Sequence, residues 1–291
     1  MRRARLVRSF ALGTALATSS AALLACAGPP PAPALPEGLA VSIQQGRLDV
    51  VGGRLVVRFE NTGDTPVTVE GFTVETPTLE PGLERTTPFE RAADDAIAVR
   101  LDLPASACDA EPGPVVVDLA FRTATGSGEG QLTAADPFDT VARVNAADCL
   151  RESVTDVAAI VMPDRLRSTG VGAERRAFID VVIEPAASGD ASMRIERVYG
   201  TTLLNAEGGI DWTLGTDVAA GDAPFTLSLP VRPARCDAHA IADDKRGTIL
   251  PFEIETSDGR SGRLDVPAGD GLKAELYAYY GERCGLEGSA G

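Results

Sequence analysis

The sequence predicts an all-β protein built from two tandem β-sandwich domains, each with one disulfide. Short segments of alternating apolar and polar residues follow one another, separated by Gly, Pro, Asn and Asp, which is the pattern of antiparallel sandwiches. The chain also contains one such unit twice, with two cysteines in each copy. Its 291 residues, 44% of them hydrophobic, are enough to bury two cores.

The first 25 residues have the order of a secretory signal peptide. Arginines come first, and a short apolar stretch, 10–24, follows them. This stretch is too short to span a membrane, since a spanning helix needs about 20 apolar residues. The run Leu23-Leu24-Ala25-Cys26 then resembles the lipobox of bacterial lipoproteins. The resemblance implies that Cys26 becomes the mature N-terminus and carries a diacylglycerol thioether.

The alternative is a soluble secreted protein that is cut near Ala25 and keeps Cys26 as an odd thiol. A lipid on Cys26 would instead hold the protein at the cell membrane, on its extracytoplasmic face, because two acyl chains give a stable anchor. Residues 26–37 are then the lipidated cysteine and a Pro-rich tether, AGPPPAPALP. Such a tether extends about 3 Å per residue and would keep the folded domains away from the membrane.

The internal repeat is clearest around the cysteines. Residues 101–104 (LDLP) precede Cys-Asp-Ala at 108–110, and residues 227–230 (LSLP) precede Cys-Asp-Ala at 236–238. In each copy an apolar strand, a Gly-containing turn, another strand and a second cysteine follow. We therefore expect two homologous domains with a short tail, and place them at 38–150, 151–285 and 286–291.

Two further strands also match between the copies. Residues 55–60 align with 178–184, and residues 67–72 align with 193–198. In the second pair the alternation shifts by one residue at the same place, which predicts a β-bulge in both domains. No convincing amphipathic helix is found, although part of 134–149 is compatible with a helical turn.

The block VRFENTGDTPVTVEGF, residues 57–72, resembles the second and third strands of bacterial immunoglobulin-like modules in exported proteins. The resemblance covers only this hairpin. It implies that the two β-sandwiches are immunoglobulin-like and says little about function.

Four cysteines remain once Cys26 is set aside. Their order and spacing predict the bridges Cys108–Cys149 and Cys236–Cys284, which close loops of similar length. The other two connectivities would tie the two halves together. Export to an oxidising compartment favours disulfides. The alternative use of four cysteines is a zinc site, which the absence of any Cys-x-x-Cys pair disfavours.

The acidic composition and the missing motifs exclude several functions. A net charge of −15 disfavours nucleic acid, whose binding needs Lys and Arg. His239 is the only histidine, and the sequence has no Gly-x-Ser-x-Gly elbow, phosphate loop or EF-hand, so we expect no enzyme activity, cofactor or metal. The composition, poor in lysine and rich in Ala, Gly, Pro and Asp, resembles that of high-GC actinobacteria.

The candidate binding site is the segment 232–247, RPARCDAHAIADDKRG, which is an insertion in the second copy. It would act as a recognition loop for a protein face or a zwitterionic small ligand. The alternative is a solvated, charge-balanced surface loop. Asp237 has a counterpart in Asp109, so we expect it to bond backbone donors near the bridge. The candidate binding residues are Arg232, Arg235, Asp237, His239, Asp243, Asp244, Lys245 and Arg246.

Trp212 is a further candidate, as part of a sugar-stacking platform with tyrosines. Here Tyr277 and Tyr279 are expected on one face of a strand and Tyr280 on the other. The alternative is ordinary core and edge packing for all four side chains.

These observations predict a lipid-anchored, non-catalytic interaction or ligand-binding module at the cell envelope. Its expected partners are the membrane, through Cys26, and an envelope protein or glycan. The first domain would act as a spacer and scaffold, and the second would carry the binding end. The alternatives are an envelope-polymer hydrolase with carboxylates from distant positions as acid and base, or a structural subunit of an envelope complex.

Overall fold

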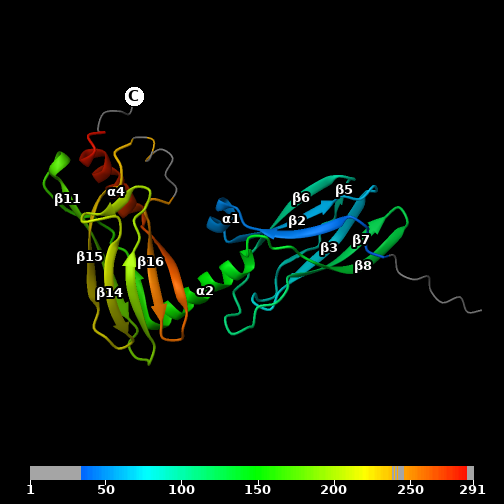
Figure 1. Ribbon diagram of the computed structural model, residues 1–291, viewed down its shortest axis with the longest axis horizontal. Helices are drawn as coiled ribbons and strands as arrows, with labels where there is room; N and C mark the ends of the chain where they lie inside the picture. Colours follow the sequence, from blue (N-terminus) through cyan, green and yellow to red (C-terminus); the bar gives the residue numbers. More distant parts are fainter. Residues whose placement is uncertain (1–33, 238, 240, 242–245, 287–291) are drawn as a thin grey trace, which may run out of the picture.

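The computed structural model describes residues 34–237, 239, 241 and 246–286 of the chain. The expected signal peptide and Cys26 lie outside the described residues. Two β-sandwiches lie one after the other along the long axis, and helix α2 (Thr140–Val157) runs between them (Figure 1). Among the described residues, no helix is long and apolar enough to cross a membrane.

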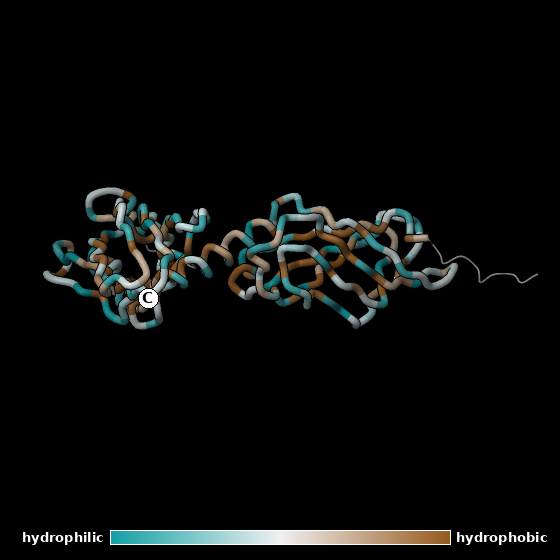
Figure 2. The backbone as a smooth tube through the Cα atoms, turned by 90° about the horizontal axis from the view of Figure 1, so that it is seen from below, coloured by the Kyte–Doolittle hydropathy of each residue, from teal (hydrophilic) through white to brown (hydrophobic). Residues whose placement is uncertain are grey.

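The first sandwich packs the sheet β1-β2-β6 against the sheet β4-β3-β7-β8, with β5 also pairing with β3. Alternate side chains of these strands point inward, and Figure 2 shows their apolar residues running through the inside of the domain. The bounds of its elements are β1 Leu39–Gln44, α1 Arg47–Val51, β2 Arg54–Asn61, β3 Val67–Glu75, β4 Glu84–Arg85, β5 Phe89–Arg91, β6 Asp95–Asp102, β7 Val116–Thr123 and β8 Gly126–Thr133.

The second sandwich packs the sheet β10-β11-β15-β13, with β9 also pairing with β11, against the sheet β14-β12-β16-β17. Its last element is a helix that follows β17. The bounds are β9 Ala158–Val161, β10 Arg167–Thr169, η1 Gly172–Glu174, β11 Arg176–Pro185, β12 Ser192–Val198, β13 Leu204–Ala206, β14 Trp212–Ala219, β15 Phe225–Pro233, β16 Ile249–Thr256, β17 Ser261–Pro267 and α4 Asp270–Arg283.

Both domains have the immunoglobulin-like strand order. In the first domain, β1, β2 and β6 occupy the positions of strands A, B and E, and β3, β7 and β8 those of C, F and G. In the second domain, β11, β15 and β13 follow the order B-E-D, and β12, β16 and β17 the order C-F-G. The predicted pair of immunoglobulin-like β-sandwiches, each with one disulfide, is confirmed.

The predicted β-bulge is present in both copies. The pairing register shifts between Val69 and Gly71 in β3, and between Ile195 and Arg197 in β12. In both strands the alternation of inward and outward side chains changes at this point, as one extra residue in a strand requires. The sequence pattern therefore located an irregularity of the backbone, not only the strands.

The expectation that the chain has no convincing amphipathic helix is wrong. Helix α4 buries four side chains with helical spacing, Leu272, Leu276, Tyr279 and Tyr280. Helix α2 lacks one continuous apolar stripe because its two ends belong to different cores: Val141 is buried in the first, and the C-terminal half is buried in the second. Its pattern therefore has no single period to detect.

Both predicted disulfides, Cys108–Cys149 and Cys236–Cys284, are present. Each joins the loop between the fifth and sixth sandwich positions, E and F, to the helical segment that ends the copy. The bridges therefore fasten a loop to a helix, unlike the antibody bridge that joins the two sheets.

Candidate functional site

The candidate loop lies between β15 and β16, at the end of the second sandwich where α4 packs (Figure 1). The described residues begin at the far end of the first domain, away from the second domain (Figure 1). The loop and the start of the described chain therefore lie on different domains.

The first part of the loop is fixed to helix α4. The hydroxyl of Tyr280 donates a hydrogen bond to the Arg235 carbonyl and accepts one from the Asp237 N–H at 3.2 Å. The Cys236–Cys284 bridge adds a covalent link at the same place. The Asp237 carboxylate accepts a hydrogen bond from the His239 N–H at 2.9 Å, which is the local backbone role expected for it.

The structure separates the charged candidates into two groups. Arg235, His239 and Arg246 are exposed, and Arg246 also forms an ion pair with Asp265. Arg232 lies on β15 and donates hydrogen bonds to the carbonyls of Ala206 and Gly209 at 3.1 and 3.0 Å, so it stabilises a turn rather than facing a ligand. The candidates Asp243, Asp244 and Lys245 lie outside the described residues.

The predicted aromatic platform is not formed. Trp212 is buried, and its indole N–H donates to the Pro230 carbonyl at 2.7 Å. Tyr277, Tyr279 and Tyr280 lie on helix α4, not on a strand, and the last two are buried. Because these rings pack in the second core, they present no shared exposed face for a sugar.

Two features of the described residues concern a possible reactive site: groups of metal-binding side chains and grooves lined by carboxylates. They contain no group of three or more His, Cys, Asp and Glu side chains that could hold a metal ion. An open groove of about 560 Å³ lies on the outer face of β3, β7 and β8, and Glu84, Asp118 and Glu129 are among its lining residues. Asp118 accepts a hydrogen bond from Gln131 at 3.0 Å. This groove belongs to the first domain, whereas the candidate loop belongs to the second.

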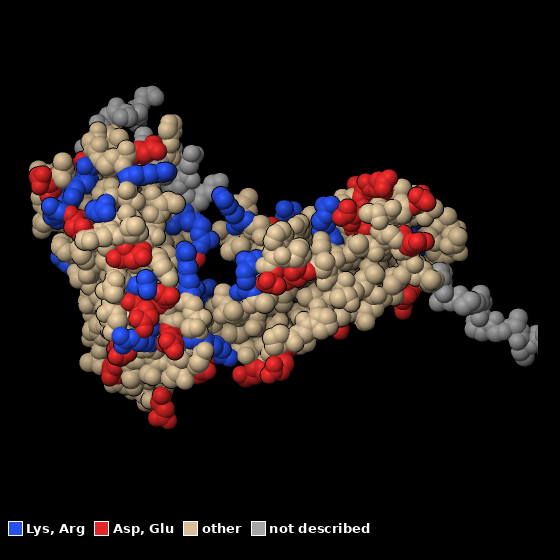
Figure 3. All heavy atoms as spheres, in the orientation of Figure 1, with Lys and Arg blue, Asp and Glu red and all other residues tan. Residues whose placement is uncertain are grey.

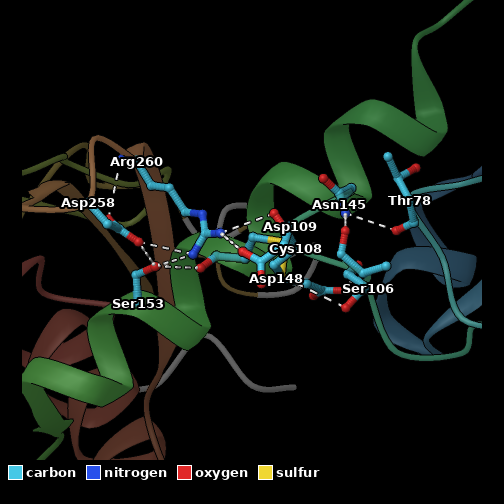
Figure 4. Close-up of a disulfide and its surroundings, with 11 residues drawn as sticks. Thr78, Ser106, Cys108, Asp109, Asn145, Asp148, Ser153, Asp258 and Arg260 are labelled. Carbon is cyan, nitrogen blue, oxygen red and sulfur yellow. Dashed lines mark hydrogen bonds and ion pairs between the residues drawn. A yellow bond between two sulfur atoms is a disulfide. The ribbon is translucent and has the colours of Figure 1, made fainter. Parts of the chain in front are cut away.

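A second arrangement, at the junction of the two domains, was not expected from the sequence (Figure 4). Arg260, in the turn between β16 and β17, donates to the Cys108 carbonyl of the first domain at 3.1 Å. It also donates to the Ser153 hydroxyl of α2 at 2.7 Å and pairs with Asp258 at 3.0 Å. Since Cys108 is itself bridged to Cys149 on α2, one guanidinium fastens the second domain to a cross-linked part of the first.

Loops of the first domain also form hydrogen bonds with α2. The Asn145 amide donates to the Thr78 carbonyl at 2.9 Å, and the Ser106 hydroxyl donates to Asp148 at 3.2 Å (Figure 4). Both contacts join α2 to loops at the end of the first sandwich. Helix α2 is therefore fixed to both domains by polar contacts as well as by the two cores.

Hydrogen bonds at this junction favour the ionised form of Asp258. The Thr256 hydroxyl, and then the Ser153 hydroxyl, donate to its carboxylate, and together they hold the pKa of Asp258 below its ordinary value. The charge that pairs with Arg260 is thus favoured by the fold. No sequence signal marks the contacts of Arg260 with Cys108 and Ser153, because both partners are distant in the chain.

Comparison with known proteins adds little to this description. No family model matches the chain, and no curated protein matches its sequence. Among solved structures, red sea bream transglutaminase is similar over 80% of this chain and 31% of its own, at 10% identity and a TM-score of 0.25. The YadV chaperone matches over 74% of this chain and 92% of its own, at 10% identity and a TM-score of 0.19.

The B domain of a biofilm associated protein matches over 79% of this chain and 83% of its own, at 10% identity and a TM-score of 0.16. The chain thus spans about a third of the transglutaminase that it matches. These scores are too low for any function to be transferred, so the function has to be argued from the described residues themselves.

Proposed function

We propose that this protein is a lipid-anchored, non-catalytic binding module on the extracytoplasmic face of the cell membrane. Cys26 carries the lipid, residues 27–36 form the tether, and the first domain is the spacer. The second domain presents the loop 232–247 to an envelope protein or a glycan. The observation that carries the proposal is that the loop starts on the second domain, whereas the described chain begins at the far end of the first domain.

The rigid connection between the domains supports this role. Helix α2 enters both cores, the Cys108–Cys149 bridge cross-links it to the first domain, and Arg260 joins the second domain to Cys108. A stiff arm keeps a binding loop at a fixed distance and orientation, which lowers the entropy lost on binding.

The anchored base of the loop also supports it. Tyr280 and the Cys236–Cys284 bridge hold the start of the loop, while Arg235 and His239 are exposed. Exposed charges beside such a held base can contact a partner without a large ordering cost. The nearby cations and carboxylates suit a polar partner surface rather than an apolar one.

The anchor is tested by cell fractionation. Cys26→Ser should move the protein from the membrane fraction to the soluble extracytoplasmic fraction, and Cys236→Ser should not. Retention of the Cys26→Ser protein in membranes would refute the lipid anchor.

The loop is tested by photo-crosslinking in cells. A photoreactive residue at His239 should crosslink one defined protein, or a glycan, and the same probe at Val171, also exposed on the second domain, should not. In a matched variant, residues 237–246 are replaced by 109–114 of the first copy. If this variant keeps the cellular phenotype and captures the same molecule through a probe at Arg235, the loop is only a surface loop.

A further inference from the structure

Helix α1 is inverted relative to an ordinary surface helix. Its apolar side chains are outside, since Leu48, Val50 and Val51 are 71%, 46% and 75% exposed. Its one acidic side chain is inside, since Asp49 is only 5% exposed. Single exposed apolar residues are common, but here three of them gather on one five-residue helix and form an apolar patch.

Polar contacts of Asp49 fix this orientation. Its carboxylate accepts hydrogen bonds from Arg100 at 2.8 Å and from the Gly46 N–H at 3.2 Å, and Arg54 lies 3.7 Å away. Burial raises the pKa of Asp49, but the bonds from Arg100 and Gly46 outweigh it and leave the pKa below its ordinary value. Because a helix of this length is not stable alone, these contacts of Asp49 hold α1 with its apolar side chains outward.

The corresponding connection in the second domain is covered by a helix. There η1 joins the first-strand position to β11, and α4 packs against it. The Gly172 N–H donates to Glu282 at 2.6 Å, Arg175 pairs with Glu282 at 2.5 Å, and Arg165 pairs with Glu275 at 2.8 Å. A helix with carboxylates along one side thus covers this connection, pairing with Arg175 within it and with Arg165 just before β10.

In the first domain the corresponding helix packs on its own sandwich only at its start, where Val141 is buried. Helix α2 leads into the second core, and among the described residues no hydrogen bond or ion pair joins it to α1. The patch therefore lacks the cover that its counterpart receives from α4. Figure 1 shows α1 at the end of the first domain that faces the second.

The surroundings of α1 are basic in a protein that is acidic overall. Arg47 is exposed beside the patch. Arg54 and Arg100 both contact Asp49, so two positive charges there face one negative charge. Figure 3 shows Lys and Arg side chains on both sides of the hollow between the domains. The net charge of the chain is −15, so this local excess of positive charge is complementary to an acidic partner.

We propose that α1 is the docking surface for an acidic amphipathic helix of a partner protein. The apolar face of that helix covers Leu48, Val50 and Val51, and its carboxylates pair with Arg47, Arg54 and Arg100. This surface belongs to the first domain, whereas the loop 232–247 belongs to the second. A flat bilayer fits poorly, because α1 faces a hollow and lies at the end away from the tether. A second acidic copy would bring like charges together.

The experiment uses the mature, lipidated protein and begins in cells. A photoreactive residue is placed at Val51, with the same probe at Val171 as the matched exposed position in the second domain. The crosslinked peptide is sequenced by mass spectrometry and synthesised, and its affinity for the purified protein is then measured. The proposal predicts one peptide, captured at Val51 only, with helical apolar spacing and Asp or Glu beside it.

The double change Leu48→Asp and Val51→Asp should lower the affinity for this peptide about tenfold or more, while Val171→Asp leaves it unchanged. Both variants should keep the wild-type Tm, because the altered side chains are exposed. Raising the salt from about 0.05 M to about 0.5 M should weaken binding. Capture only of lipid, capture only of a second copy, or no peptide enriched over the Val171 probe would each overturn the proposal, and the loop-replaced variant should still capture the peptide.

Discussion

Helices α2 and α4 hold the same place in the repeated unit, but they stabilise the molecule in different ways. Each follows the last strand of its sandwich and leads to the second cysteine of its copy. Helix α4 folds back and buries its apolar side chains in its own sandwich, whereas the C-terminal half of α2 enters the next one. The comparison teaches that one position in a repeat becomes a cover or a connector according to which core takes its apolar residues.

The two disulfides differ in the same way. Cys236–Cys284 lies beside a loop on one domain, whereas Cys108–Cys149 lies at the junction, where Arg260 reaches it from the second domain (Figure 4). Bridges of nearly the same loop length therefore have different structural surroundings. The following predictions test this difference, beginning with the largest expected effect.

Removing either bridge should lower stability by a similar amount, but only one removal should loosen the junction. The bridges close loops with sequence separations of 41 and 48, so replacing either cysteine pair by serine should cost about 4 kcal/mol by the chain-entropy estimate. Urea denaturation measures this loss. The distribution of distances between spin labels on the two domains should broaden only in the variant that combines Cys108→Ser with Cys149→Ser. Equal broadening in both variants would contradict the comparison.

Leu150→Ala should destabilise the second domain, although Leu150 follows the last cysteine of the first copy. Its side chain is buried in the second core, so we expect a loss of about 2–5 kcal/mol, as for Leu276→Ala in α4. Hydrogen exchange resolved by peptide identifies the domain that loses protection. A loss of protection confined to strands of the first sandwich would show that α2 ends in its own domain.

Arg260→Ala should change the arrangement of the domains more than their stability. The side chain is 29% exposed, and pairs of this kind contribute about 1 kcal/mol or less. Losing its hydrogen bond to the Cys108 carbonyl should nevertheless broaden the distribution of distances between spin labels on the two domains. Arg263→Ala is the control, since Arg263 pairs with Asp265 within the second domain. If the distance distributions of the wild type and Arg260→Ala are identical, Arg260 does not contribute to the rigidity of the junction, and helix α2 and the Cys108–Cys149 bridge account for it.

The smallest expected effect is a pH dependence at the junction. Because the folded-state pKa of Asp258 is lowered, its carboxylate stabilises the fold at pH values above about 4, the ordinary value for an unfolded aspartate. This stabilisation is lost as the pH falls through the lower folded-state value. Asp258→Asn should flatten the dependence of Tm on pH below about 4, and an unchanged slope would assign the acid sensitivity to other carboxylates.

Local patterns predicted much of the fold and only part of the candidate site. Alternation and turn residues predicted the strands and the bulge before Gly71, and cysteine spacing predicted both bridges. The site was harder, because a charged residue looks the same in the sequence whether it is exposed or bonded. Arg232 proved to hold a turn, and Trp212 proved to be buried.

The sequence by itself determined the two sandwiches, their bulges and their disulfides, because strand alternation, the internal repeat and the order of the cysteines can be read directly along the chain. Only the tertiary structure decided the path of α2, the contact of Arg260 with Cys108 and the outward face of α1. Each of these depends on groups that come together only after folding: two separate cores share α2, residues 152 positions apart meet at the junction, and Arg54 and Arg100 hold Asp49 inward.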